Sequence, residues 1–325
     1  MESTTLSVRN QEIFTDSPVS NNITGNQLLE SLKKWQSPPD PSMNHHIVGG
    51  RQHNGTTEWF IKSDKCHKWM AAGSLLWIHG KRRFPLVLAL VILYNQIFQR
   101  APGRASYGLL LLHFAVLGTY LVCSSAIIND VTTLCEARLA SMAYFYFDFR
   151  DVDKQSRRKL LSSLLVQLST HSNTFCNILS HLYEAHDNGA HRPNDKALMQ
   201  CLQEMLTLPN QGPVYIILDA LDECPDTSDV PSPREQVLDL VKHLVDLRLP
   251  NLRICITSRL EVDISEALKS LASHTVSLHC EGGQKKDIAD YIRSVVYSGS
   301  GKFMRLREED KEHVIQTLSE RADGM

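Results

Sequence analysis

The sequence has little net charge, no paired-cysteine motif and no apolar leader. Its formal net charge is −2 over 325 residues, so no basic field predicts binding to nucleic acid. The eight cysteines are dispersed without a CxxC pair, which is typical of reduced intracellular thiols and not of a disulfide framework. The first residues contain no apolar h-region, so no secretory signal is predicted. We therefore expect a cytoplasmic protein.

A phosphate-binding loop of the form GxxxxGK[ST] is also missing. In such a loop, backbone N–H groups cradle phosphates and the lysine reaches the β and γ phosphates. Residues 74–80 have the pattern of a strand that enters a glycine turn at Gly80, which is where this loop would follow. The chain continues instead through Lys81-Arg82-Arg83 into an apolar stretch, so Lys81 has no phosphate role.

What is present predicts a folded α/β domain. Hydrophobic residues make up 42% and charged residues 22%, as in globular proteins. Strands and helices then alternate, which predicts a three-layer sandwich with a parallel sheet. The predicted strands cover 142–150, 214–219, 252–259 and 275–279. The predicted helices cover 26–36 with Asn26 as N-cap, 153–185 with an interruption near 172–173, 194–208, 233–249, 263–271, 285–297 and 308–321.

The stretch VYIILDALDE, at residues 214–223, is the most informative. Five uninterrupted apolar residues between Gly212-Pro213 and Pro225 have the pattern of a strand buried on both faces. Asp219, Asp222 and Glu223 follow it, at the edge where open parallel sheets bind ligands. An aspartate placed in this way holds Mg²⁺ in nucleotide hydrolases. The alternative is a core strand that runs into a solvated acidic turn.

A second strand ends in Thr257-Ser258-Arg259. A planar, permanently charged guanidinium at that position suits a γ-phosphate contact. The alternative for Arg259 is a surface ion pair with a carboxylate such as Glu261.

The sequence contains two groups of histidine and cysteine residues, which are types that can bind metal ions. Their spacing matches no known zinc-ligand pattern, so ordinary packing and surface roles are favoured for both groups. They are His45, His46, His53 and His67 in one group, and Cys176, Cys201, His181, His186 and His191 in the other.

Residues 142–325 resemble the NACHT family of STAND-class P-loop NTPases, in its fungal, nephrocystin-like form. The resemblance lies in YFYFDFRD at 144–151, VYIILDALDECPD at 214–226 and RICITSRLE at 253–261. GTTEWF, GSLLWIHGK and VCSSAIIND, at 55–60, 73–81 and 122–130, extend it upstream. The resemblance implies a nucleotide-controlled switch that binds Mg²⁺ with ATP or GTP. It also implies roles for single residues: Asp219 as the metal ligand, Asp222 or Glu223 as the residue that positions the attacking water, Arg259 as the γ-phosphate sensor, and Gly80 at the start of the phosphate loop.

The departure from this family is an apolar insert at residues 82–121, where its phosphate loop should be. Within 84–99 and 106–129 there is no Asp, Glu, Lys or Arg, and the second run is about long enough to span a bilayer. A membrane hairpin over 84–129 is therefore one interpretation. A misjoined gene segment is the other, and the abrupt change of character at Arg82 favours it.

These observations predict the following organisation: a mobile tail with a short helix at 1–42, a lead-in with the first strand at 43–81, the insert at 82–121, a NACHT-like core at 122–300 and the start of a helical region at 301–325. The predicted function is a nucleotide switch of a signalling or innate-immunity-like protein, impaired by the interrupted loop. The alternative is a non-catalytic remnant that serves as a scaffold for protein partners or self-association, or that is anchored in a membrane.

Overall fold

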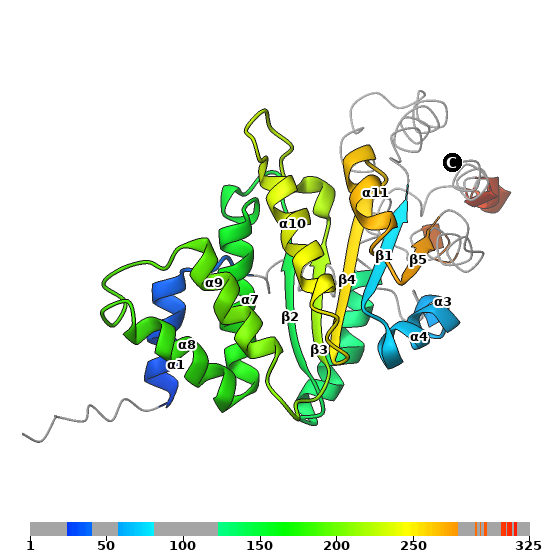
Figure 1. Cartoon of the computed structure of the whole chain (residues 1–325). Helices are drawn as coiled ribbons and strands as arrows, with labels where there is room; N and C mark the ends of the chain where they lie inside the picture. Colours follow the sequence, from blue (N-terminus) through cyan, green and yellow to red (C-terminus); the bar gives the residue numbers. More distant parts are fainter. Residues whose placement is uncertain are drawn as a thin grey trace, which may run out of the picture.

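The computed structural model describes residues 25–40, 58–80 and 123–278, with isolated stretches between 290 and 316 (Figure 1). The predicted tail over the first 24 residues, the insert at 82–121 and most of the helices predicted after residue 280 lie outside the described residues.

Five parallel strands form one sheet, which confirms the predicted α/β fold. Its order is β2-β3-β4-β1-β5, so β3, β4 and β1 are flanked by strands on both sides. Burial on both faces explains their uninterrupted apolar sequences. The strands are β1 (Leu75–Gly80), β2 (Ser141–Tyr146), β3 (Val214–Asp219), β4 (Leu252–Arg259) and β5 (His274–Ser277).

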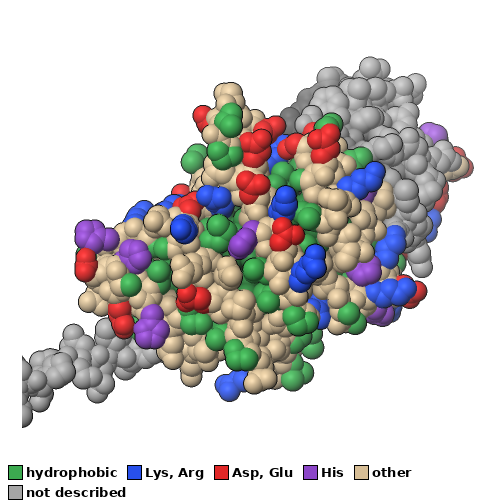
Figure 2. Space-filling model, in the orientation of Figure 1, with side chains coloured by type: hydrophobic (Ala, Val, Ile, Leu, Met, Phe, Trp, Pro, Cys, Tyr) green, Lys and Arg blue, Asp and Glu red, His purple; other side chains and the backbone are tan. Residues whose placement is uncertain are grey.

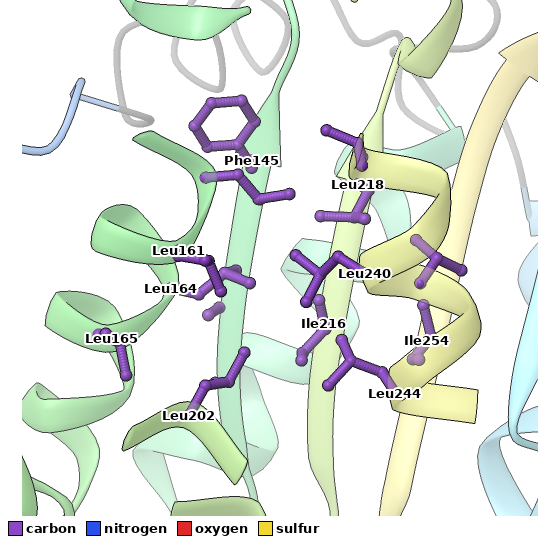
Figure 3. Close-up of a cluster of buried hydrophobic side chains, with 14 of the residues drawn as sticks. Phe145, Leu161, Leu164, Leu165, Leu202, Ile216, Leu218, Leu240, Leu244 and Ile254 are labelled. Atoms are coloured by element: carbon purple, nitrogen blue, oxygen red, sulfur yellow. The ribbon is translucent and has the colours of Figure 1, made fainter. Parts of the chain in front are cut away.

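Helices cover both faces of the sheet, and each face has its own hydrophobic core. On one face, Leu161 and Leu240 pack with Ile216 and Ile254 of the central strands (Figure 3). On the other face, Trp69 and the helix at 123–136 pack against residues of β1, β3 and β4. The fold therefore has the three layers that the sequence predicts.

The helices and short 3-10 turns have bounds set by local capping. They are α1 (Gly25–Gln36), α3 (Glu58–Ile61), α4 (Asp64–Ala72), η1 (Val152–Lys154), α7 (Arg157–His171), α8 (Asn173–Glu184), α9 (Asp195–Leu206), η2 (Leu221–Glu223), α10 (Pro233–Asp246) and α11 (Val262–Lys269). Ser172 caps α8 by accepting a hydrogen bond from the Thr174 amide, which confirms the predicted interruption. Ser232 and Glu235 form a capping box at α10.

Several predicted boundaries are wrong, and the first two of them have a local reason. The strand expected over 142–150 ends at Tyr146, because the Asp148 carboxylate accepts the Arg150 amide and turns the chain. The helix expected from residue 153 begins only after Ser156, whose hydroxyl caps it. Helix α1 begins at residue 25, so Asn26 is not its N-cap. The predicted ends of α9, α10 and α11 also lie two or three residues too far along the chain.

The outer edge of β2 is covered by side chains of α7. The Gln167 amide donates to the Tyr144 carbonyl at 2.8 Å and accepts from the Tyr144 amide at 3.0 Å, as a neighbouring strand would. One turn further along, His171 hydrogen-bonds the backbone of Met142. Exposed strand edges invite pairing with another chain, and these contacts occupy this one.

No helix within the described residues is long and apolar enough to cross a membrane. The predicted hairpin at 84–129 falls almost entirely outside that part of the chain.

Replacing Ile216, which is fully buried in β3, with alanine should lower the free energy of unfolding by about 2–5 kcal/mol. The reason is that the two-sided core around β3 cannot collapse into the space left by the side chain. Urea denaturation measures the change. Val262→Ala, at a position 74% exposed, is the matched control and should stay within about 0.5 kcal/mol of the parent. Equal effects of the two substitutions would contradict the described core.

Candidate functional site

The connections that follow β1 and β4 diverge at the carboxyl edge of the sheet. These strands are neighbours, but the next described helix after β1 lies on the Trp69 face and α11, which follows β4, lies on the opposite face. Ligands of open α/β sheets bind where following connections diverge in this way. At this edge β1 ends in Gly80, β3 in Asp219 and β4 in Arg259.

Asp219 is the last residue of β3 and is 1% exposed. The Thr257 hydroxyl of neighbouring β4 donates to its Oδ1 atom at 2.7 Å. The same hydroxyl accepts the amide of Ala220 at 2.9 Å. One buried side chain therefore fixes both the carboxylate and the first peptide of the turn that follows it.

The Oδ2 atom of Asp219 is buried and has no hydrogen-bond partner among the described residues. Burial raises the pKa of this carboxyl to about 6, although the nearby hydroxyls of Ser124 and Thr257 lower it. A buried carboxylate oxygen without a partner carries a desolvation cost that a bound cation or ordered water would relieve.

After Asp219 the chain turns sharply through Ala220, which has left-handed backbone angles (φ 55°, ψ 47°). A residue with a Cβ atom pays about 1–2 kcal/mol for this conformation. Its amide hydrogen bond to Thr257 helps to hold it. The result is the short turn η2, which keeps Asp222 and Glu223 at the carboxyl edge.

Asp222 and Arg259 are brought together by this turn. Asp222 Oδ1 accepts the Arg259 amide at 2.8 Å, and its Oδ2 atom lies 3.3 Å from the Arg259 Nε atom. The Asp222 side chain is 7% exposed and that of Arg259 is 35% exposed. The ion-pair partner found for Arg259 is therefore an acid of the neighbouring strand end.

Glu223 lies on the other side of the turn, against the loop after β2. Its Oε2 atom accepts the Phe149 amide at 3.4 Å. Burial raises its pKa to about 7, and the charges of Asp222 and Asp148 act in the same direction, while Arg259 and the Phe149 amide lower it. A carboxyl group with a pKa near neutrality can accept a proton and release it again, which suits general base chemistry.

Two further arginines, Arg234 and Arg150, contact the acidic residues of this edge or the turn that carries them, and the sequence did not point to either. Arg234 of α10 donates to the carbonyls of Asp222 and Cys224 at 2.9 Å and pairs with Asp263 of α11 at 3.1 Å. Arg150 forms a two-point ion pair with Asp148, which lowers the pKa of that carboxyl. The only sequence signal was the position of Arg234 just after the Ser-Pro start of a predicted helix.

Gly80 is the last residue of β1 and lies beside the end of β4. It is paired with Arg259 across the sheet, and its carbonyl accepts the Leu260 amide at 3.0 Å. One residue earlier in β4, the Ser258 hydroxyl accepts the indole N–H of Trp77 at 2.9 Å. Lys81 and the rest of the expected phosphate loop lie outside the described residues.

No group of three or more His, Cys, Asp or Glu within the described residues is arranged to hold a metal ion by itself. Mg²⁺ in nucleotide sites needs only one or two carboxylates, because phosphates and waters supply its remaining ligands. The single available oxygen of Asp219 is therefore compatible with Mg²⁺ that arrives with a nucleotide.

The described residues thus form a parallel α/β sheet with helices on both faces, with a buried aspartate and an arginine at its carboxyl edge. Residues 119–259 match the family model described as Nephrocystin 3, N-terminal. The match begins within the last residues of the predicted insert and ends at Arg259, so it includes β2, β3 and β4 but not β1. None of the curated proteins matches the chain significantly.

The raised pKa of Glu223 predicts a pH-dependent stability. Its folded-state pKa of about 7 lies above the ordinary value of 4.5, so the folded protein holds a proton that the unfolded chain releases between these values. Stability should therefore fall as the pH rises from about 4.5 to about 7. Glu223→Gln removes the buried charge and should stabilise the protein at pH 8 by on the order of 1–3 kcal/mol.

Urea denaturation at pH 5, 6, 7 and 8 tests this expectation. Glu266→Gln, at an exposed position of α11, is the matched control and should leave the pH slope unchanged. If the Glu223→Gln protein kept the parent's slope between pH 5 and 7, Glu223 would not be the buried carboxyl that titrates there.

Proposed function

We propose that the chain is a NACHT-type nucleotide-binding switch module, of the nephrocystin-like class, that retains the metal and sensor half of its site. The phosphate-binding half is interrupted at the sequence level by residues 82–121. Binding of ATP or GTP is therefore impaired in this chain. A role in a signalling or innate-immunity-like protein is part of the same proposal, and it rests on the resemblance alone.

The observation that carries the proposal is the buried, unpartnered Oδ2 atom of Asp219. A buried carboxyl group with one oxygen outside hydrogen-bond reach of any partner carries a desolvation cost, which a strand that only completed a core would have no reason to keep. Thr257 aligns this carboxylate from the neighbouring strand. Such an arrangement is expected where a cation takes up the free oxygen.

The chain's own residues then have distinct roles. Asp219 would hold Mg²⁺, directly or through water, and the bound ion neutralises phosphate charge. Glu223, with its pKa near 7, would accept a proton from a water molecule. Arg259 would donate hydrogen bonds to a terminal phosphate oxygen, and Gly80 would begin the phosphate-binding turn.

Loss of the phosphate loop should weaken nucleotide binding by orders of magnitude. Backbone N–H groups and a lysine in that loop supply most phosphate contacts in this class of site. The rim above the strand ends is also rich in acidic side chains (Figure 2), which repel a polyphosphate when no loop cations offset them.

A non-catalytic scaffold is the second candidate function. Large apolar side chains are exposed after β2 and after β4: Phe149 is 67% exposed, Val152 at the start of η1 is 81% exposed and Val262 at the start of α11 is 74% exposed. Apolar groups rimmed by polar ones are typical of protein contact surfaces. This candidate includes self-association and binding of protein partners, and it includes membrane anchoring through residues 84–129.

The full chain should show no binding of MgATP or MgGTP by isothermal titration calorimetry up to millimolar nucleotide. A variant in which Pro-Gly-Ser-Gly-Lys-Ser replaces residues 82–121 should bind one of them at micromolar concentration, because the cradle is restored next to Asp219. Adding Asp219→Asn to that variant should abolish binding. Asp226→Asn, an exposed acid of the same loop, is the matched control and should leave the affinity within about twofold.

Two results would contradict the proposal. Micromolar binding to the unaltered chain would show that its phosphate half is functional. A well-folded loop-replaced chain that binds neither nucleotide would favour the scaffold, and sedimentation of the unaltered chain with protein partners or with itself would then be the next measurement.

A further inference from the structure

We propose that Asp222 acts as a latch on Arg259: it holds the guanidinium group through its Nε atom and offsets its charge, which weakens the attraction of this arginine for a phosphate group. Asp222 is then a positioning residue, and Glu223 is left as the acid available to a water molecule. The inference rests on the proposed function, because it concerns the regulation of the same site. It gives Asp222 a different role from the one that the family resemblance implies.

The first support is that Arg259 engages both oxygens of Asp222. The Arg259 amide donates to Oδ1 at 2.8 Å, and the Arg259 side chain approaches Oδ2 through its Nε atom at 3.3 Å. With a side chain 7% exposed, Asp222 has little contact with solvent. A carboxylate used in this way at both oxygens is poorly suited to orient a water molecule as well.

The second support is that the backbone of Asp222 is held independently of Arg259. Its carbonyl accepts a hydrogen bond from Nη2 of Arg234 at 2.9 Å, and Arg234 is itself paired with Asp263 of α11. The turn that carries Asp222 starts at the left-handed Ala220, whose amide is bonded to Thr257. Asp222 is thus a fixed anchor, and the more exposed Arg259 is the partner that can move.

The third support is the part of Arg259 that remains available. Within the described part of the chain, neither Nη atom of Arg259 has a hydrogen-bond partner, and the side chain is 35% exposed. An arginine recognises phosphate through such parallel N–H donors. The latch therefore leaves donors for an anion but reduces the net positive charge that attracts it.

Glu223 forms no ion pair within the described part of the chain, whereas Asp222 is paired with Arg259. Its described hydrogen bond is a single long one from the Phe149 amide, and its pKa is near 7. It can change protonation state at neutral pH without breaking an ion pair. We therefore assign Asp222 to holding Arg259 and Glu223 to exchanging a proton with water.

The test measures inorganic pyrophosphate binding to the full chain at pH 8, low salt and without Mg²⁺. Asp222→Asn should tighten pyrophosphate binding on the order of tenfold, because it frees Arg259 from a carboxylate that it nearly touches. Glu223→Gln also removes one negative charge from the same turn but does not release Arg259, so its gain should stay below about threefold. Arg259→Gln should remove the gain when combined with Asp222→Asn.

A second measurement reports on the latch itself. In ¹⁵N NMR spectra, the Arg259 Nε–H signal should exchange slowly with water in the parent and become fast in Asp222→Asn. Asp222→Ser, which also removes the carboxylate, provides a second variant if Asp222→Asn fails to fold. Circular dichroism and urea denaturation identify the folded variants.

Three outcomes would overturn the latch: an Arg259 signal unchanged by both substitutions, an equal gain in Asp222→Asn and Glu223→Gln, or a gain that persists in the Arg259→Gln background. Absence of pyrophosphate binding to every variant at 50 mM would overturn it as well. None of these depends on Mg²⁺, Asp219 or the missing loop. Failure of the nucleotide-binding proposal, measured on the loop-replaced chain, is therefore a separate result.

Discussion

The buried hydroxyl of Thr257 is the contact on which the organisation of the carboxyl edge depends. It donates to Asp219 at the end of one strand and accepts from Ala220 at the start of the next turn. The parallel register, with Leu218 opposite Ile256, places β3 and β4 so that this hydroxyl reaches both groups. Without it, the buried Asp219 carboxyl group and the partly buried Ala220 amide would both lose a partner, and the loss at the buried carboxyl would cost about 1–3 kcal/mol.

The electrostatics of this edge follow from the same arrangement. Burial raises the pKa of Asp219 to about 6 and that of Glu223 to about 7. Asp222, between them in the sequence, forms an ion pair with Arg259. Three neighbouring acids thus have three different environments. Carboxyl groups whose pKa values are raised by burial are a cost to stability, and such groups cluster at functional sites.

Much of the fold could be predicted from the sequence because its signals are local. The apolar run before Asp219, the interruption near residues 172–173 and the strand that ends at Arg259 all have the predicted identity. The pairing within the site could not be predicted. It requires β3 beside β4 and a left-handed alanine at position 220, and alanine gives no sequence signal for that conformation.

The cover that α7 places over β2 also limits how the domain can assemble. Gln167 satisfies the outward amide and carbonyl of Tyr144, so a strand from another molecule would have to displace that side chain before it could pair there. Growth of the sheet by strand addition is therefore blocked on the β2 side. The side chain of one helix residue thus does for this edge what an additional strand would do, and it makes the helix that follows β2 a determinant of how the domain can associate.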